Sequence, residues 1–241
     1  MSENSEGRPE SIRAYGHGAS RYDHNVKWFD VFARFGFNIS GWRNQAVASL
    51  GLRSGDTVVD VGCGTGLNFP LLQDAIGSEG KIIGVDQSQT MLDQARQTVA
   101  VNGWQNVELI CADAAGFEFP PQVDGVLSTY VLILVPDCGR VVTNACQALR
   151  PDGRLSILDM AWPRYCPLWW RHVLFFLRSY GVTAGILRAC PWKGVQESMA
   201  KGLVDFSCRQ RWFGFFYLAE GRKASEVANQ QEDLPIDTYR S

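Results

Sequence analysis

The stretch Val58–Pro70, which reads VVDVGCGTGLNFP, decides the fold of this chain. Val58, Val59 and Val61 are β-branched and apolar, as in a strand buried on both faces of a parallel sheet. Three glycines then alternate through a tight turn, and Leu67 begins a predicted helix. Such a strand–turn–helix unit directs backbone N–H groups and a helix N-terminus at a ligand, and both favour negative charge. The stretch therefore predicts a nucleotide-type cofactor site.

The spacing of the glycines distinguishes between two kinds of cofactor. A dinucleotide-binding fingerprint has its third glycine three places after the second, and here Leu67 occupies that place. The chain instead reads D-x-G-x-G-x-G from Asp60 to Gly66. This pattern resembles motif I of the class I S-adenosylmethionine (SAM)-dependent methyltransferases. The resemblance implies that the loop holds the amino-acid part of SAM, and that Asp60 either orders the loop or meets the cofactor's ammonium group.

Two further acids follow the next two predicted strands. Asp86 lies twenty residues after Gly66, and an acid at this position suits hydrogen bonding to ribose hydroxyls. Its alternative role is to cap the helix predicted from Ser88. The resemblance implies that Asp86 grips both ribose hydroxyls and that Asp113 accepts a hydrogen bond from the adenine amino group. The alternative for Asp113 is an ordinary capped turn.

Taken together, the pattern and the resemblance predict a SAM site, with S-adenosylhomocysteine as product and no metal. Within it, Met91 is expected against the adenine, Ala112 or Ala114 beside the ring, and Ser128 near the methyl donor. The complete predicted set is Asp60, Gly62, Cys63, Gly64, Thr65, Gly66, Asn68, Asp86, Gln87, Met91, Ala112, Asp113, Ala114 and Ser128.

The centre of the chain alternates strand and helix patterns, which predicts a parallel sheet wound with helices. The fold class is α/β: a Rossmann-like doubly wound sheet of the class I methyltransferase type, with five parallel strands and a C-terminal antiparallel pair. The predicted strands cover 57–61, 81–85, 107–111, 125–131, 154–159, 204–208 and 213–219, and the helices 71–76, 88–101 and 141–149. A turn at 151–153 (Pro-Asp-Gly) is expected to end the last helix.

Five regions are predicted along the chain. Residues 1–45 form a disordered tip and a helical lid, 46–160 the SAM-binding core, 161–203 an aromatic insertion on the acceptor side, 204–221 the terminal strand pair and 222–241 a flexible tail.

Composition excludes several classes of protein and partner. The 241 residues carry a formal charge of −2, and the basic residues are scattered, which argues against nucleic acid as a partner. The seven cysteines form no C-x-x-C pair, which indicates reduced thiols rather than a zinc site. The polar N-terminus lacks the apolar run of a signal peptide. We expect a cytoplasmic protein, with peripheral contact at the inner membrane face as an additional hypothesis; the oligomeric state is not predicted.

The reaction needs a general base only if the acceptor is protonated at working pH. The candidates are His17, Tyr22, His24, Tyr130 and His172, each with a packing or surface role as its alternative. We select Tyr22 and His24 as the catalytic prediction. Both lie where the resemblance places an N-terminal lid over the cofactor.

The acceptor is predicted from two aromatic runs. Residues 164–178 are rich in Trp, Phe and Arg and too short for the ~20 residues of a membrane span. They are predicted as a core helix, an acceptor lid or a helix in a membrane interface. Residues 212–217 could form the far wall of the cavity. Aromatic faces can hold an amine by cation–π attraction, although an aromatic core strand explains the run equally.

The motif order resembles the branch that contains ubiquinone/menaquinone-biosynthesis C-methyltransferases and bacterial phosphatidylethanolamine N-methyltransferases. The resulting prediction is methyl transfer to a small or amphipathic acceptor, with a lipid or small amine ahead of C- or O-methylation of a quinol or phenol. Two other classes stay open: an NAD-dependent oxidoreductase, which Leu67 disfavours, and a SAM-binding protein without transfer activity.

Overall fold

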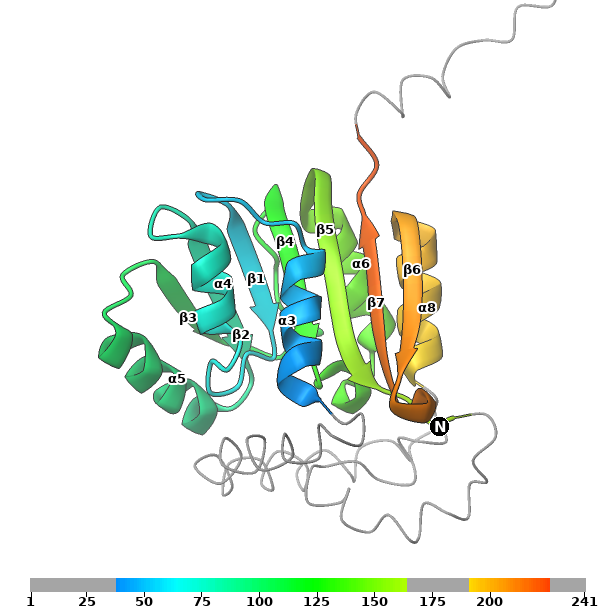
Figure 1. The fold of residues 1–241 in the computed structure, drawn as a ribbon, viewed down its shortest axis with the longest axis horizontal. Coiled ribbons are helices and arrows are strands. Elements are labelled where there is room, and N and C mark those ends of the chain that lie inside the picture. Colours follow the sequence, from blue (N-terminus) through cyan, green and yellow to red (C-terminus); the bar gives the residue numbers. More distant parts are fainter. Residues whose placement is uncertain (1–37, 164–190, 226–241) are drawn as a thin grey trace, which may run out of the picture.

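One sheet of seven strands runs through the part of the chain that the computed structural model describes, residues 38–163 and 191–225. The order across the sheet is β3-β2-β1-β4-β5-β7-β6 (Figure 1). The strands are β1 (Thr57–Val61), β2 (Lys81–Asp86), β3 (Val107–Cys111), β4 (Val123–Thr129), β5 (Leu149–Met160), β6 (Val204–Arg211) and β7 (Phe216–Arg222). The helices are α3 (Ile39–Ser49), α4 (Phe69–Ile76), α5 (Gln89–Asn102), α6 (Cys138–Ala148) and α8 (Pro191–Gly202), with short 3-10 turns η2 (Leu132–Leu134) and η5 (Trp212–Gly214).

Strand pairing confirms the predicted class of sheet. β1 to β5 are parallel, β7 is antiparallel to β5, and β6 is antiparallel to β7. Parallel neighbouring strands need a crossover connection, which usually contains a helix. The alternation of apolar strands with helices in the sequence therefore favours parallel pairing of β1 to β5.

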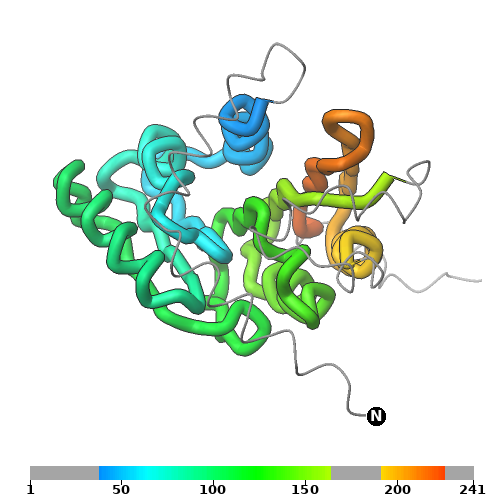
Figure 2. Tube along the Cα trace, turned by 90° about the horizontal axis from the view of Figure 1, so that it is seen from below, coloured from blue at the N-terminus to red at the C-terminus, as the bar shows by residue number. Residues whose placement is uncertain are grey.

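The helices cover the two faces of the sheet and bury a separate core on each (Figure 2). One core joins α3, α4 and α5 to side chains such as Val58, Ile82 and Leu127. The other joins α6 and α8 to Val59, Val61 and Ile157. Neighbouring residues of a strand thus enter opposite cores, which explains why the central strands read as unbroken apolar runs.

Three predicted boundaries are wrong for local reasons. The fourth strand ends at Thr129 rather than at residue 131, because Tyr130 has a left-handed φ of 62° that turns the chain away. Phe213 belongs to the turn η5 rather than to the last strand, with a φ of 56°. The predicted stop at 151–153 lies inside β5, where the pairing with β4 shifts register between Val123 and Gly125.

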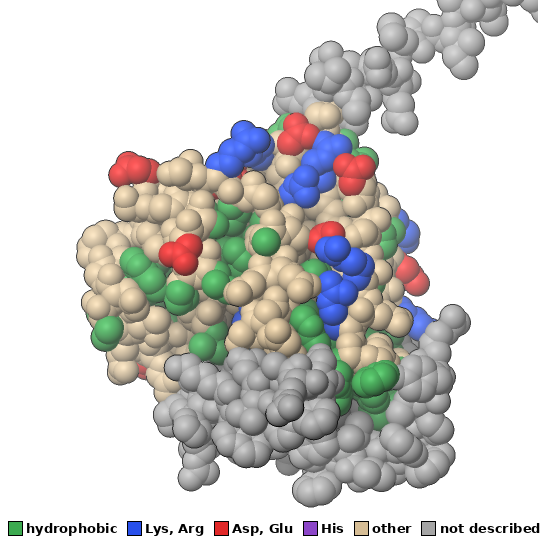
Figure 3. Space-filling view, in the orientation of Figure 1, with side chains coloured by type: hydrophobic (Ala, Val, Ile, Leu, Met, Phe, Trp, Pro, Cys, Tyr) green, Lys and Arg blue, Asp and Glu red, His purple; other side chains and the backbone are tan. Residues whose placement is uncertain are grey.

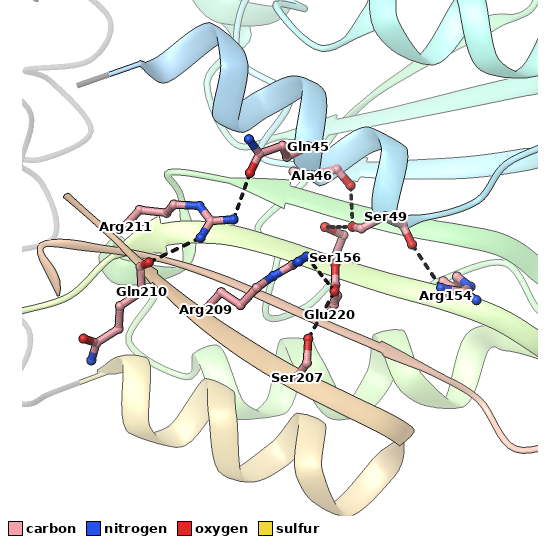
Figure 4. A network of polar contacts seen from close by, with 10 residues as sticks. All are labelled: Gln45, Ala46, Ser49, Arg154, Ser156, Ser207, Arg209, Gln210, Arg211 and Glu220. Atoms are coloured by element: carbon pink, nitrogen blue, oxygen red, sulfur yellow. Dashed lines mark hydrogen bonds and ion pairs between the residues drawn. The ribbon is translucent and has the colours of Figure 1, made fainter. Parts of the chain in front are cut away.

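Polar contacts from the C-terminal half of helix α3 connect it to the sheet (Figure 4). Ser49 Oγ donates to Ser156 Oγ on β5 at 2.9 Å, and an Arg211 side-chain N–H donates to Gln45 Oε1 at 2.8 Å. The boundary predicted between residues 45 and 46 falls inside this helix. Residues 1–37, 164–190 and 226–241, which contain most of the predicted lid, insertion and tail, lie outside the described residues.

The surface over α3, β7 and β6 carries Lys and Arg side chains, and hydrophobic side chains gather near η5 (Figure 3). The arginines are partly neutralised: Arg209 pairs with Glu220 at 2.8 Å and Arg222 with Asp205 at 2.9 Å. Within the described ranges, no helix has the length and apolar character needed to cross a membrane.

Candidate cofactor site

Two adjoining cavities lie where β1, β2 and β4 end, at the carboxyl edge of the parallel strands. They have volumes of about 90 Å³ and about 60 Å³ and share lining residues that include Gly62, Asp86 and Val131. Ligands of open α/β sheets bind in this position, outside the carboxyl ends of the strands. Of the predicted set, the residues that line the two cavities are Gly62, Cys63, Gly64, Thr65, Asp86, Gln87, Met91, Ala112, Asp113 and Ala114.

The glycine loop forms one wall of the larger cavity and owes its shape to the missing side chains. Gly62 has a φ of 68°, and a Cβ there would lie 2.3 Å from a methyl carbon of Val131. Gly64 has a φ of 56°, but a Cβ there would meet nothing within 4 Å and would project into open space. The loop therefore approaches Val131 closely at one glycine and leaves room for a ligand at the other.

Asp86 is held against this loop by two backbone hydrogen bonds. Gly64 N donates to Asp86 Oδ2 at 2.9 Å, and Ser88 N donates to Asp86 Oδ1 at 2.8 Å. Burial raises the pKa of Asp86, and these two bonds oppose the rise. The helix cap considered for Asp86 belongs to Ser88, whose side chain accepts from Met91 N. An ionised carboxylate has about four acceptor positions, so Asp86 can still accept bonds from ligand hydroxyls.

Asp113 lies in the smaller cavity with Ala112 and Ala114 on either side of it in the chain. Its Oδ1 accepts a hydrogen bond from Ala115 N at 3.1 Å, which is the capped turn considered as its alternative role. The turn aids rather than excludes ligand contact, because it fixes the carboxylate in the wall of the cavity.

Four predicted residues lie beneath the cavity instead of in its walls: Asp60, Gly66, Asn68 and Ser128. Asp60 is completely buried, and Asn68 Nδ2 donates to its two oxygens at 3.0 and 3.1 Å. Burial raises the pKa of Asp60 to about 7, against the Asn68 bond and the charge of Arg43. Asp60 thus supports the loop from below, because Asn68 follows the loop directly. Ser128 Oγ donates to Val61 O at 3.1 Å and braces β4 against β1.

Sequence reasoning missed Arg43, which lies in the wall of the larger cavity. Its Nη1 donates to Asn68 Oδ1 and to Thr129 Oγ1, each at 2.7 Å, and its guanidinium lies 5.0 Å from the centre of the Tyr130 ring. Arg43 stands on α3, far in sequence from the loop, and no local pattern marks it. The hydrophobic lining of Val131, Leu134 and Val135 was missed for the same reason.

Residues 58–153 match the family described as "Methyltransferase domain". The matched span contains the glycine loop, Asp86 and Asp113, and the observed sheet has the strand order expected for the class. Residues 58–153 therefore form a methyltransferase domain, and the similarity to named relatives places this domain in the class I SAM-dependent superfamily.

Two curated relatives are similar to this chain over more than half of its length. A 2-phytyl-1,4-naphtoquinone methyltransferase of Synechococcus elongatus is 35% identical over 156 residues, which is 62% of this chain and 64% of that protein. A demethylmenaquinone methyltransferase of Listeria monocytogenes is 31% identical over 151 residues, 58% of this chain and 64% of that protein. This chain thus spans just under two thirds of the length of either relative.

Among solved structures, the fold is similar to that of geranyl diphosphate C-methyltransferase from Streptomyces coelicolor, crystallised with S-adenosyl-L-homocysteine. The TM-score is 0.62 at 16% identity, over 77% of this chain and 76% of that one. At this identity the similarity concerns the fold alone.

An aromatic wall joins the matched span to the rest of the chain and consists of Trp42, Tyr130, Trp212 and Phe216. Phe216 contacts the other three rings. The centre of its ring lies 5.1 Å from that of Trp42, 6.0 Å from that of Tyr130 and 6.2 Å from that of Trp212. Phe216 packs against Tyr130, which lines the larger cavity, but no residue of the run 212–217 is among the residues that line either cavity. Tyr217 points to the opposite face and is buried in the other core.

The predicted catalytic residues Tyr22 and His24 lie outside the described residues, as do His17 and His172. Their role in catalysis therefore stays a prediction. Tyr130 is the one of the five candidates that the structure describes, and it lines the larger cavity.

Proposed function

We propose that this protein transfers the methyl group of SAM to a small, apolar acceptor of the quinol type. The observation that carries the proposal is the pairing of Asp86 with the open glycine Gly64, 2.9 Å apart from Oδ2 to N in one cavity. A carboxylate with spare acceptor positions suits a ribose, and the space above Gly64 admits the chain attached to it.

The remaining residues fit the same ligand. Asp113, Ala112 and Ala114 offer a hydrogen-bond acceptor between two small side chains, which suits the edge and faces of an adenine ring. Met91 adds a flexible apolar contact. We accordingly assign the ten predicted residues that line the cavities to direct contact with SAM and Asp60, Gly66, Asn68 and Ser128 to the support of the loop.

When bound, SAM supplies an electrophilic methyl group on a positively charged sulfur. The protein's part is to align the acceptor with that methyl group and to exclude water. Val131, Leu134 and Val135 give this cavity an apolar side, and Tyr130 connects it to the aromatic wall. Tyr22 and His24 are proposed to remove the acceptor's proton where its chemistry requires this.

The names of the relatives favour a quinol over the amine that we predicted from the aromatic residues. Both relatives are named for naphthoquinone or menaquinone substrates. One face of the Tyr130 ring already meets the guanidinium of Arg43, whose positive charge disfavours a second cation nearby. Because a quinol is apolar and aromatic, it also suits the stacking contacts of Trp212 and Phe216.

The test is transfer of a labelled methyl group from SAM to each of two acceptor panels. One panel holds short-chain naphthoquinols and benzoquinols under reducing conditions, and the other holds ethanolamine lipids and small amines. The proposal expects labelled quinol and no labelled amine. Labelled amine with unlabelled quinol would restore the original acceptor prediction. SAM binding without any product in either panel would favour a binding protein.

A further inference from the structure

The turn η5 exposes two neighbouring aromatic side chains. Phe213 is 74% exposed and Trp212 is 37% exposed. The other large apolar side chains that are exposed in the described part of the chain are Val101 and Val204, which are separate from each other and from this turn in sequence. Figure 3 shows hydrophobic side chains gathered at this place. An exposed cluster of aromatic side chains marks a surface of contact with another body.

The backbone of the turn holds this pair in a strained conformation. Trp212, Phe213 and Gly214 have φ values of 42°, 56° and 81°, in the left-handed region that bulky side chains rarely adopt. Phe215 N donates to Trp212 O at 3.1 Å, and Ala161 N donates to Phe215 O at 2.9 Å. These bonds fix the turn from both sides. Strain of this kind persists where the surrounding structure imposes it and is concentrated at functional positions.

The inner side of the turn is packed, which fixes the direction of the exposed pair. The ring centre of Phe215 lies 5.7 Å from that of Trp162 and 5.5 Å from that of Trp212. The ring of Phe213 is centred 6.3 Å from that of Trp212 and is the most exposed of the four. The exposure of Phe213 is therefore a property of a well-anchored turn.

The turn lies at the carboxyl edge of the parallel strands, where the two cavities are. β7 begins at Phe216, which pairs with Met160, the last residue of β5. From there the aromatic wall leads from Trp212 through Phe216 to Tyr130, which lines the larger cavity. The exposed pair and the cofactor site thus share one edge of the sheet and are connected by rings in contact.

The strand that leads into the turn is basic. Residues 206–219 contain Arg209 and Arg211 and no acidic residue. Arg211 has neutral partners among the described residues, since its side chain donates to Gln45 Oε1 at 2.8 Å and to a backbone carbonyl at 3.4 Å. Arg209 pairs with Glu220 but keeps 53% of its side chain exposed. The charge of Arg211 is therefore available to an anionic partner.

The sequence that leaves and rejoins this edge is basic as well. Trp162 and Trp192, on either side of residues 164–190, share one small hydrophobic cluster, so both described ends of that stretch lie together. Between Asp159 and Glu197 the sequence contains no acidic residue. The basic residues in the same interval are Arg164, Arg171, Arg178, Arg188 and Lys193. Exposed aromatic rings beside basic charge are complementary to the surface of a bilayer that contains anionic lipid.

We propose that the turn Trp212–Gly214 docks on the surface of a phospholipid bilayer that contains anionic lipid. Phe213 enters the headgroup region, where aromatic rings are favoured, and Arg211 faces the lipid phosphates. The docking surface itself is independent of the acceptor, and its purpose rests on the proposed function. An apolar quinol partitions into a bilayer, and docking at this edge brings the cavity to the phase in which that acceptor is dissolved.

The experiment measures co-sedimentation of the full-length protein with two kinds of vesicle, without SAM or acceptor. One kind is phosphatidylcholine alone, and the other is equal parts of phosphatidylcholine and phosphatidylglycerol. The variants are Phe213→Asn and Arg211→Gln. Asparagine is chosen at position 213 because it tolerates a left-handed backbone. The melting temperature and the size-exclusion elution volume of every variant are recorded alongside.

Val101→Asn and Arg53→Gln are the matched controls. Val101 is 86% exposed near the end of α5, which packs on β3 at the far side of the sheet from β6. Arg53 is exposed and precedes β1, so it lies at the amino edge of the parallel strands. Both controls thus remove the same type of group as the test variants at a distance from the turn.

The parent is expected to bind the anionic vesicles more tightly than the neutral ones, and added salt should weaken the binding. Phe213→Asn should lower the partition coefficient on both kinds of vesicle by about 10-fold. Arg211→Gln should lower it by about fivefold on the anionic vesicles only. Both controls should sediment as the parent does. Methyl transfer to a quinol held in anionic vesicles should fall in Phe213→Asn, whereas transfer to a water-soluble short-chain quinol should not.

A parent that sediments with neither kind of vesicle would overturn the inference. Vesicle binding that neither Phe213→Asn nor Arg211→Gln weakens would also overturn it, because another surface would then make the contact. A dimeric parent and a monomeric Phe213→Asn with equal vesicle binding would make the turn an interface between two copies instead. If Phe213→Asn does not fold, Arg211→Gln decides alone. A parent that docks as expected but methylates no quinol would support the docking surface and refute the proposed function.

Discussion

The two walls of the larger cavity are built in different ways. The first, which we call the motif wall, comes from one continuous stretch that runs from the glycine loop to Met91 and includes Asp86. The second, the assembled wall, brings together Arg43 from α3 with Thr129, Tyr130 and Val131 from the end of β4. The motif wall is polar backbone and a carboxylate, whereas the assembled wall is a buried cation among apolar and aromatic groups.

The difference shows how the chain divides the tasks of one site. The geometry of the motif wall depends on residues within one stretch of the chain, such as Gly64 bonded to Asp86. The assembled wall depends on α3 lying across β4 and β5. We therefore expect substitutions in the motif wall to affect every adenosyl ligand.

The largest expected effect is on the motif wall. Asp86→Ala should weaken SAM by about 100-fold or more, because two hydrogen bonds to a charged group are lost at about 1.5–3 kcal/mol each. S-adenosylhomocysteine, which has the same ribose, should bind more weakly by the same factor. Calorimetry with both ligands measures this.

Asp93→Ala is the control for Asp86→Ala, since Asp93 is an exposed aspartate on α5 that pairs with Arg96 at 2.6 Å. It should leave both affinities unchanged. An Asp86→Ala protein that bound SAM like the parent would show that the assignment of the ribose contact is wrong.

A smaller effect is expected where the two walls touch, at Gly62 and Val131. Gly62→Ala should destabilise the fold by about 1–3 kcal/mol through overpacking, because its Cβ would lie 2.3 Å from a Val131 methyl carbon. Val131→Ala removes that methyl, so it should relieve part of the loss. Urea unfolding of both single variants and the double variant measures the coupling.

The double variant should be more stable than the sum of the single changes predicts. Strict additivity would mean that the left-handed φ of 68° at Gly62, rather than contact between the walls, sets the cost.

The smallest effect concerns pH, because each wall rests on one completely buried aspartate. Asp60 lies beneath the motif wall; Asp159 accepts from Ile133 N at 2.8 Å and holds η2, whose Leu134 lines the cavity. Burial raises the pKa of each carboxyl to about 7. The folded state therefore binds protons that the unfolded state releases above about pH 4, and stability falls as pH rises toward 7.

Between pH 6 and pH 7, each carboxyl should lower the stability of the apo protein by at most about 1.4 kcal/mol. Urea unfolding at the two pH values tests this. In Asp60→Asn, the free energy of unfolding should lose only the part of its pH dependence that Asp60 contributes. If Asp60→Asn shows the same change in unfolding free energy between the two pH values as the parent, the raised pKa of Asp60 is contradicted. Asp159 would then account for the pH dependence.

The same division into two walls explains what could be predicted from the sequence. The bounds of β1 and β3 were predicted correctly, since apolar runs and glycine turns are local signals. The five parallel strands and the C-terminal antiparallel pair were also predicted correctly, whereas the order of the strands across the sheet was not predicted. Asp86 and Asp113 were placed at the cavity because they follow strands whose carboxyl ends must meet at one edge. Asp60, by contrast, lies within β1 and faces the interior.

The assembled wall could not be predicted because its members meet only through the fold. Arg43 finds Thr129 across 86 positions of sequence, and this contact exists only once β4 has paired with β1. The turn η5 was missed because aromatic residues favour strands and dominate the run 212–217. The left-handed backbone at all three of its residues appears only in the structure.

The position of β7 between β5 and β6 has a consequence for synthesis of the protein. Its partner β5 ends at Met160, but β7 is complete only at Arg222, about 60 residues later. At about 5–20 residues per second, a ribosome needs roughly 3–12 s for that interval. During this time the nascent chain already carries the whole methyltransferase domain span yet exposes the open edge of β5, which is a template for aggregation.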